Sequence, residues 1–435
     1  MRHWFEDRHF RSLLKNTSYL GISRAVAAVA SIAAFAFTAR ALGVTLFGIL
    51  ILIHSYAQAA SGITKFQSWQ LIIRYGGGVF RGETAEFKAA TGFAFGLDVT
   101  SAVVGTIAAI ALLPLIGAWF GISENYLAIA MLYCLVLPTM AAATPTGVLR
   151  ALDRFDLISW QSTVDPIARA ILAGIAFAAD APFEAYVAIW FGTNLGGDLL
   201  QWFLAWRELR RRDLLTGIEP TLRPTTLPNA WRFAIHVNLT SSLWTAWGPI
   251  ARLLVGGLLG PAAAALYRVA SSLADSAQRP ADLLARAYYP EIVRMDLRTK
   301  RPWKMTLRGA VLASFIGLLA VLIMVLGGRP LIELIFGAEF LPAYPVLMVL
   351  IIAPLLGMIS FPLPSMLYAL DRPEAPLWAR LAGTISYFII VAPMASQFGL
   401  IGAAASFVVA YAVMVAVLML QTWREYRRIR TAGPD

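Results

Sequence analysis

Nine basic residues lie within the long apolar runs of this sequence, where a charged side chain is costly unless it is paired or faces a polar cavity. Four of them, Arg24, Lys65, Arg252 and Arg268, have no acidic residue within one helical turn. Arginine binds phosphate or carboxylate oxygens through two parallel N–H donors. The pattern predicts a cationic cavity, lined by these four residues and Arg279, that binds an anionic substrate. The nine residues are Arg24, Lys65, Arg169, Arg252, Arg268, Arg279, Arg286, Arg308 and Arg380.

Two of the apolar ranges carry polar side chains at steps of three and four residues, which places those side chains on one face of a helix. In the range 262–288 the stripe consists of Arg268, Ser272, Asp275, Arg279, Asp282 and Arg286. In the range 46–73 it consists of His54, Gln58, Ser61, Lys65 and Ser68. We expect both stripes to line one central pathway. Candidates there for binding a proton or a sodium ion are Asp98, Asp275, Asp282 and His54.

Some of these charged residues also have a structural interpretation as ion pairs along one helix. Asp275 and Asp282 lie four and three residues from Arg279, and Asp165 lies four residues from Arg169. Opposite charges at these spacings are neighbours on a helix surface. We therefore expect Asp165 to pair with Arg169, and pairing competes with cavity lining for Arg279.

Other candidates have equally ordinary roles. His54 is more typical of a hydrogen-bonded packing residue than of a proton carrier, and Asp98 could pair with a neighbouring helix as readily as bind an ion. Cys134 is the single cysteine, so the chain has no Cys-x-x-Cys metal or redox site. A phosphate-binding GxxxxGK[ST] loop is also absent from the sequence. We expect no metal and no cofactor.

The composition indicates whether these residues lie in a water-soluble protein or in a membrane. Of 435 residues, 59% are apolar and 14% are charged, and the mean hydropathy is +0.67. Soluble domains carry about 25% charged residues, so the composition excludes a cytosolic globular enzyme, a disordered chain and a disulfide scaffold. The net charge of +11 does not require nucleic-acid binding, because cytoplasmic loops of membrane proteins are rich in Lys and Arg. An all-α polytopic membrane protein remains.

The apolar runs predict twelve transmembrane helices, each needing roughly 20 residues. With the N-terminus in the cytoplasm, nearly all Lys and Arg of the connections fall on the cytoplasmic side, and only Arg40 and Arg329 fall on the other. The alternation predicts an inner-membrane protein with both termini in the cytoplasm. The expected spans are 17–39, 46–73, 90–116, 125–149, 157–179, 183–206, 233–257, 262–288, 305–327, 343–370, 376–395 and 399–421.

The sequence repeats at about half its length. Leu-Arg-Ala-Leu-Asp-Arg at 149–154 ends the fourth span, and Leu-Tyr-Ala-Leu-Asp-Arg at 367–372 ends the tenth, 218 residues later. Prolines within these two spans repeat at nearly the same offset, which predicts that both spans are kinked. The repeat predicts two six-helix lobes of the same orientation around a central cavity, a pattern known in secondary transporters. We expect them at 1–213 and 233–435, joined by a cytoplasmic linker at 214–232.

Several short segments, in this order and spacing, resemble the Wzx-like oligosaccharide flippase family, which belongs to the multidrug/oligosaccharidyl-lipid/polysaccharide exporter superfamily. They are Asn16, 39–48 (Ala-Arg-Ala-Leu-Gly-Val-Thr-Leu-Phe-Gly), 147–151 (Gly-Val-Leu-Arg-Ala), 266–270 (Leu-Tyr-Arg-Val-Ala) and 336–340 (Phe-Gly-Ala-Glu-Phe). The resemblance implies alternating access that moves undecaprenyl-pyrophosphate-linked oligosaccharide units to the outer leaflet for surface polysaccharide. It also implies partners: membrane lipids and the polymerase and glycosyltransferases of the same pathway.

Two other classes of function compete with this interpretation. An ion-coupled exporter of drugs or small molecules should carry acidic residues in its cavity to attract cationic compounds, whereas the excess here is basic. A membrane enzyme acting on lipid-linked sugars should show a large outer loop or a DxD metal site in a cytoplasmic domain, and the sequence has neither. The residues therefore favour a transporter of an anionic lipid-linked substrate.

Overall fold

The computed structural model describes residues 8–140, 143–293, 295, 297, 299–372 and 374–431. Throughout this part of the chain the regular elements are α-helices and short 3-10 helices, which confirms the all-α prediction. Six helical stretches among these residues are long and apolar enough to cross a membrane by length and composition. Some of these stretches contain more than one predicted span, and the count of twelve spans stays a prediction.

Two of the long helices each contain a kink at a glycine. Helix α1, Arg8–Thr64, bends at Gly43, where φ is 65°. Helix α15, Glu374–Thr431, bends at Gly399, where φ is 58°. A positive φ is strained for residues with a Cβ, which explains why glycine occupies both positions. The kink at Gly43 falls in the connection 40–45 between two predicted spans, and Gly399 is the first residue of the predicted span 399–421.

The second predicted span, 46–73, is not one helix. Helix α1 ends at Thr64 and helix α2 covers Ser68–Gly76. Gln67, which precedes α2, has φ −82° and ψ 51°, outside the helical region. At this break the side chain of Lys65 bonds to the fourth span and that of Ser68 bonds to the third. The predicted stripe that ran from His54 to Ser68 on one helix face is therefore wrong beyond Ser61.

The predicted kinks in the fourth and tenth spans are confirmed. The fourth span consists of α4 (Leu127–Tyr133), a 3-10 turn at Cys134–Val136, α5 (Leu137–Met140) and α6 (Thr144–Ala151). The tenth consists of α12 (Ala343–Leu350), α13 (Ile352–Ser360) and α14 (Pro362–Ala369). Pro145 and Pro362 stand in the first turns of α6 and α14, where the missing N–H costs nothing.

The remaining long helices agree with predicted spans within a few residues, apart from extensions at their ends. Their bounds are α3 Thr84–Ile116, α7 Phe155–Ala178, α8 Phe183–Arg211, α9 Ala230–Leu259, α10 Pro261–Val293 and α11 Lys300–Phe336. Short 3-10 helices at Val79–Arg81, Ala118–Phe120, Glu124–Tyr126 and Ala338–Phe340 connect or extend them.

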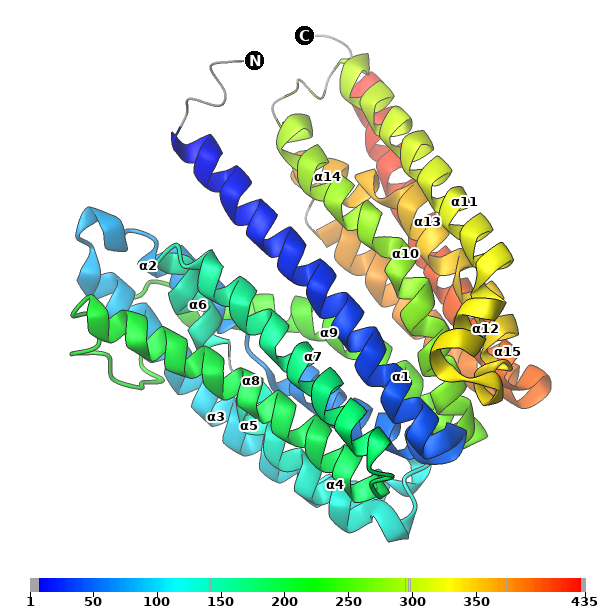
Figure 1. The fold of residues 1–435 in the computed structure, drawn as a ribbon. Helices are drawn as coiled ribbons and strands as arrows, with labels where there is room; N and C mark the ends of the chain where they lie inside the picture. The colour runs from blue at the N-terminus through cyan, green and yellow to red at the C-terminus, as the bar shows by residue number, and fades with distance from the viewer. Residues whose placement is uncertain are drawn as a thin grey trace. The chain divides into compact units, whose positions relative to one another are not determined.

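The chain forms two compact units, Met1–Leu253 and Leu254–Asp435. In the first unit α1 packs along α7, and α7 along α8, as Figure 1 shows, while α2 packs against α3 and α6. In the second unit α10 packs against α12, α13 and α14, and α15 packs against α12, α13 and α14. The start of α9 belongs to the first unit because Ala230 and Ala234 pack against Leu71 and Phe93. The lobes predicted from the repeat stay a prediction.

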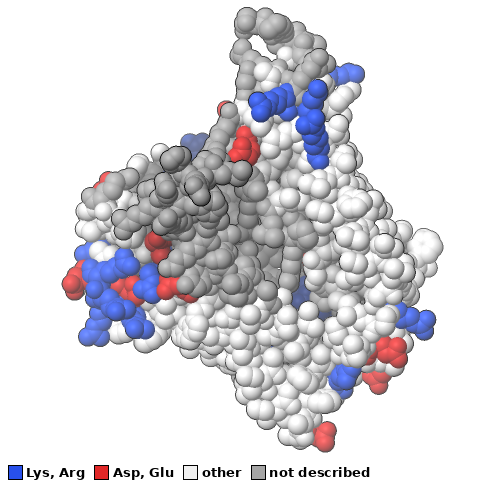
Figure 2. Space-filling model, turned by 45° about the horizontal axis from the view of Figure 1, so that its top comes forward, with Lys and Arg blue, Asp and Glu red and all other residues white. Residues whose placement is uncertain are grey.

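Much of the described surface is apolar, as expected for a chain surrounded by lipid. On α11, large side chains such as Leu307, Val311, Phe315 and Leu326 are exposed. Figure 2 shows one face on which uncharged residues predominate and Lys, Arg, Asp and Glu gather in a few groups. Exposed apolar side chains are unfavourable in water, whereas they are favourable in contact with the hydrocarbon tails of a bilayer.

The repeated segments at 149–154 and 367–372 form the same turn. Asp153 and Asp371 adopt left-handed conformations with φ of 55° and 56°. The amide of Arg154 donates to the carbonyl of Leu149 at 2.8 Å, and the amide of Arg372 donates to that of Leu367 at 2.9 Å. This hydrogen-bond pattern ends a helix through a left-handed residue. The local geometry thus matches in the two halves, as the repeated sequence predicts.

Candidate functional site

Asp98 on α3 anchors the N-terminus of α6. Its Oδ2 accepts hydrogen bonds from the amides of Ala143 at 2.8 Å and Thr144 at 2.7 Å. Its Oδ1 accepts a hydrogen bond from the hydroxyl of Ser68 at 2.6 Å. The first amides of a helix lack intrahelical partners and carry partial positive charge, so a carboxylate there satisfies both needs. Asp98 is only 2% exposed, and this contact gives it a structural role; its predicted ion coupling is untested.

Lys65 lies at the break between α1 and α2 and contacts the other side of the interrupted fourth span. Its Nζ donates to the carbonyl of Met140, the last residue of α5, at 3.0 Å. Carbonyls at a helix C-terminus carry partial negative charge and attract cations. Lys65 also interacts electrostatically with Asp98 and Asp198. Opposite charges from the second and third spans therefore contact the two half-helices of the fourth.

Arg252 on α9 is held by two side chains of α1. Its Nε donates to the hydroxyl of Ser55 at 2.8 Å, and its Nη2 donates to Oε1 of Gln58 at 2.7 Å. The side chain is buried, at 8% exposure. Both acceptors are neutral, and these two bonds orient the guanidinium. Two of the predicted cavity residues are therefore positioned by α1. Lys65 directly follows its last residue, and Arg252 bonds to two of its side chains.

His54 is a buried packing residue with a hydrogen bond, as expected. Its Nδ1 lies 2.9 Å from the hydroxyl of Tyr133, and its ring meets that of Trp190 edge-on with centroids 5.0 Å apart. The predicted pair is also confirmed, since Nη2 of Arg169 lies 2.8 Å from Oδ1 of Asp165. The role of His54 in ion coupling stays a prediction.

The predicted stripe of the eighth span lies on one continuous helix, α10. Arg268 is partly buried there and interacts electrostatically with Asp275, whose side chain is exposed. The side chains of Arg279 and Asp282, and that of Arg24 on α1, lie outside the described residues. Their roles in binding or ion coupling therefore stay predictions.

A salt-bridge cluster at the repeated turn was not predicted. Arg154 pairs with Oδ2 of Asp156 at 2.8 Å and with Glu208 near the end of α8. Arg372 pairs in the same way with Oε1 of Glu374 at 3.6 Å and with Oε1 of Glu425 near the end of α15 at 3.1 Å. We call these two clusters the arginine clasps. The first clasp joins the start of α7 to the end of α8. The second joins the start of α15 to its own end, which correspond to the predicted eleventh and twelfth spans.

The sequence contains a signal for the arginine clasps. Residues 206–211 read Trp-Arg-Glu-Leu-Arg-Arg and residues 423–428 read Trp-Arg-Glu-Tyr-Arg-Arg, 217 residues apart. This second repeated segment supplies Glu208 and Glu425. In the first clasp, hydrogen bonds from Arg154 hold the pKa of the Asp156 carboxyl below its usual value, so the pair stays ionised at neutral pH.

The two arginine clasps should differ in their contribution to stability. Glu208 is 4% exposed and also lies near Arg211 and Arg212, whereas the side chain of Glu425 is 21% exposed. Removing the charge of a buried acid leaves its partners uncompensated and costs about 3 kcal/mol, against about 1 kcal/mol or less for a more exposed pair. We expect Glu208→Gln to lower the unfolding temperature in detergent more than Glu425→Gln does. Equal or reversed shifts would contradict this ranking.

Comparisons with known proteins agree with these observations. Residues 13–296 match the family described as "Polysaccharide biosynthesis protein". The chain is 38% identical over 347 residues to the inner membrane protein YghQ of Escherichia coli (strain K12), covering 79% of this chain and 98% of that protein.

Solved structures share the fold at low sequence identity. An inward-facing multidrug resistance MATE family transporter of the MOP superfamily superposes with a TM-score of 0.72 at 14% identity, over 94% of this chain and 96% of that one. The lipid II flippase MurJ in an inward closed conformation gives a TM-score of 0.67 at 13% identity, over 92% and 87% of the two chains. The chain shares the fold of the MATE and MurJ structures and belongs to the polysaccharide biosynthesis protein family.

Proposed function

We propose that this transporter is a flippase that moves undecaprenyl-pyrophosphate-linked oligosaccharide repeat units across the inner membrane by alternating access, for surface polysaccharide such as O-antigen or exopolysaccharide. Three findings support the proposal: the family, a fold shared with a lipid II flippase, and a buried arginine oriented by neutral groups. The last carries the proposal, because it suggests the chemical class of the substrate.

The chemistry of Arg252 fits a diphosphate. Its guanidinium is always charged and presents N–H donors in a planar fork that matches two phosphate oxygens. Ser55 and Gln58 hold two of its nitrogens at 2.8 and 2.7 Å, so little side-chain entropy is lost when an anion binds. Water-poor surroundings strengthen such a contact. We assign the diphosphate to Arg252, with Arg24, Lys65, Arg268 and Arg279 as further cations along the pathway.

A second candidate is an exporter of drugs or other small molecules, favoured by the likeness to the multidrug MATE transporter. The two candidates make opposite predictions for a deletion strain. Loss of a flippase should remove surface polysaccharide, because its lipid-linked units stay in the inner leaflet. Loss of a drug exporter should leave polysaccharide intact and increase susceptibility to cationic compounds.

A reconstituted assay tests the flippase directly. The purified protein is placed in proteoliposomes with a fluorescent lipid-linked oligosaccharide, and the fraction reaching the opposite leaflet is measured with a membrane-impermeant quencher. We expect flipping that requires native protein, with heat-unfolded protein as the control. Proton or sodium gradients are then imposed in turn to identify an energy source. Absence of flipping under every gradient, with drug efflux from the same vesicles, would contradict the proposal.

A further inference from the structure

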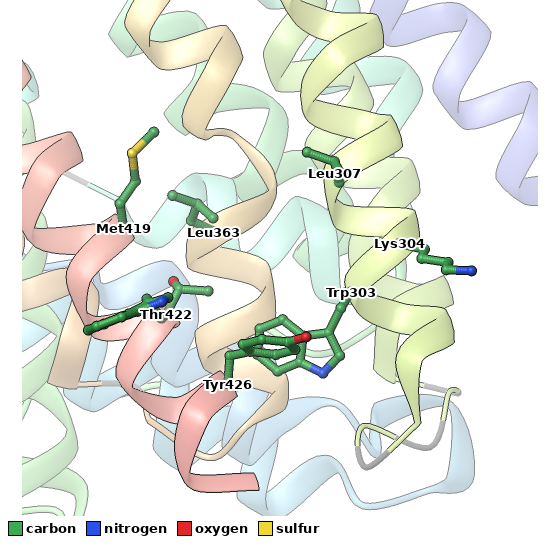
Figure 3. Close-up of a pocket in the computed structure, with 8 residues that line it drawn as sticks. Trp303, Lys304, Leu307, Leu363, Met419, Thr422 and Tyr426 are labelled. Carbon is green, nitrogen blue, oxygen red and sulfur yellow. The ribbon is translucent and has the colours of Figure 1, made fainter. Parts of the chain in front are cut away.

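A lateral groove lies within the second unit between α11, α14 and α15, with a cavity volume of about 410 Å³. Leu307, Leu363 and Met419 lie at one end of it, and Trp303 and Tyr426 lie at the other (Figure 3). Leu307 is 66% exposed, so the groove opens toward the lipid-facing surface. We call it the α11–α15 groove. Its two ends differ in chemistry, and this suits an amphiphile.

The apolar end of the α11–α15 groove offers methyl and thioether groups only. The opposite end is built from aromatic rings, with Trp303 and Tyr426 packed edge-to-face at 4.8 Å between centroids. Tryptophan and tyrosine with one apolar and one polar edge favour the boundary between lipid tails and head groups. The groove therefore runs from acyl-chain depth to head-group depth.

Basic side chains surround the aromatic end of the groove. Lys304 lines its rim, with its ammonium pointing away from Trp303 and Tyr426 toward the outside (Figure 3). The guanidinium of Arg427 lies over the ring of Trp423, a lining residue, at 3.6 Å from the centroid. Both cations lie at the helix ends that the charge pattern predicts to be cytoplasmic. Their charge is complementary to an anionic head group.

The repeat shows how the corresponding space is used in the first unit. An offset of 217 maps the end of α15 onto the end of α8 and the start of α11 onto α3. There, Phe87 and Leu209 belong to a buried cluster that also contains Leu214, and Ile218 packs against it. Leu214 and Ile218 follow α8 in the chain, so apolar side chains from outside the helices pack in this cluster of the first unit. An apolar occupant is thus compatible with this site in the fold.

We propose that the α11–α15 groove binds one anionic phospholipid of the cytoplasmic leaflet. The head group lies at the aromatic end, where the positive charges of Lys304 and Arg427 attract its phosphate, and an acyl chain lies along Leu307, Leu363 and Met419. The proposal is independent of the cargo, because the bound lipid is a lasting component of the second unit. It predicts that the protein retains an anionic phospholipid in preference to a neutral one.

The test measures lipid binding to the full chain by native mass spectrometry. Delipidated protein is titrated with phosphatidylglycerol and, separately, with phosphatidylcholine. Each basic group near a membrane surface contributes about 1 kcal/mol to anionic lipid binding, or about fivefold. We expect the double variant Lys304→Gln/Arg427→Gln to bind phosphatidylglycerol about 25-fold more weakly and phosphatidylcholine unchanged. Leu307→Gln, at an exposed position, should weaken retention of the acyl chain.

The first unit supplies a control pair, Lys88→Gln/Arg210→Gln on α3 and α8. At the offset of 217, Arg210 corresponds to Arg427, and Lys88 lies one residue after the position that corresponds to Lys304. Arg210 lies over Trp206 at 5.4 Å, as Arg427 lies over Trp423. We expect this control to bind phosphatidylglycerol like the unmodified protein. Equal weakening by both double variants, or no preference for phosphatidylglycerol, would mean general attraction to the bilayer and would overturn the proposal. Tighter competition by undecaprenyl phosphate than by phosphatidylglycerol would assign the groove to the lipid carrier and would also overturn it.

Discussion

Replacing Arg252 by glutamine is expected to slow flipping of a lipid-linked oligosaccharide by at least about thirtyfold in proteoliposomes, equivalent to about 2 kcal/mol. Glutamine removes the charge and the two parallel donors that match a diphosphate. It remains able to bond Ser55 and Gln58, which hold Arg252 at 2.8 and 2.7 Å, so the packing of α9 against α1 is largely kept. The flipping rate of Arg252→Lys should lie between those of the unmodified protein and Arg252→Gln, because lysine keeps the charge and loses the planar fork.

The control for this result is Arg308→Gln. Arg308 is also a basic residue of an apolar range, yet it lies exposed on α11, so its loss should leave flipping within about twofold of the unmodified rate, as for a solvated charge. Unfolding temperatures in detergent show whether each variant is folded. A folded Arg252→Gln protein that flips at the normal rate would remove Arg252 from the binding site.

Replacing Asp98 by alanine is expected to produce the largest loss of stability of any single change considered, about 3–5 kcal/mol. Alanine removes the acceptor of three hydrogen bonds and leaves the amides of Ala143 and Thr144 buried without it. Lys65, which interacts electrostatically with Asp98, also loses part of its compensating charge. The measurement is the thermal unfolding midpoint of the purified protein in detergent.

Two variants separate helix capping from the predicted ion coupling. Asp98→Asn keeps one acceptor oxygen and should recover part of the stability. Ser101→Ala, one turn along α3, removes a buried hydroxyl that bonds only within its own helix at 3.1 Å and should have little effect. If Asp98→Ala unfolds at the normal temperature and loses only ion-dependent transport, the carboxylate is a coupling site and not a cap.

Sequence periodicity predicted the contacts that are local. Asp165 and Arg169 are four residues apart on one helix, and their ion pair could be read from that spacing. The partners of Arg252 lie almost two hundred residues away in the chain, at Ser55 and Gln58, and no single-sequence pattern connects them. Hydropathy predicts spans because lipid imposes a length on them, yet it says nothing about which polar side chains meet.

The interruption at 65–67 shows the same limit more sharply. Lys65 and Ser68 continue a helical pattern in the sequence, but each bonds to a different neighbouring span, and residues 65–67 are not helical. Tertiary contacts outweigh a weak local preference. The arginine clasps were not predicted, although the sequence contains a signal for them. That signal is the repeated segment that ends α8 and α15.

The positions of Lys65 and Asp98 along the chain have a consequence for insertion into the membrane. Lys65 and Asp98 both precede the half-helices of the fourth span, whose ends lie at Met140 and Thr144. During synthesis from the N-terminus, the second and third spans therefore enter the membrane before the interrupted span leaves the ribosome. The opposite charges of Lys65 and Asp98 can neutralise one another until the fourth span is inserted. The fourth span then meets partners for the ends of its half-helices that are already in the membrane.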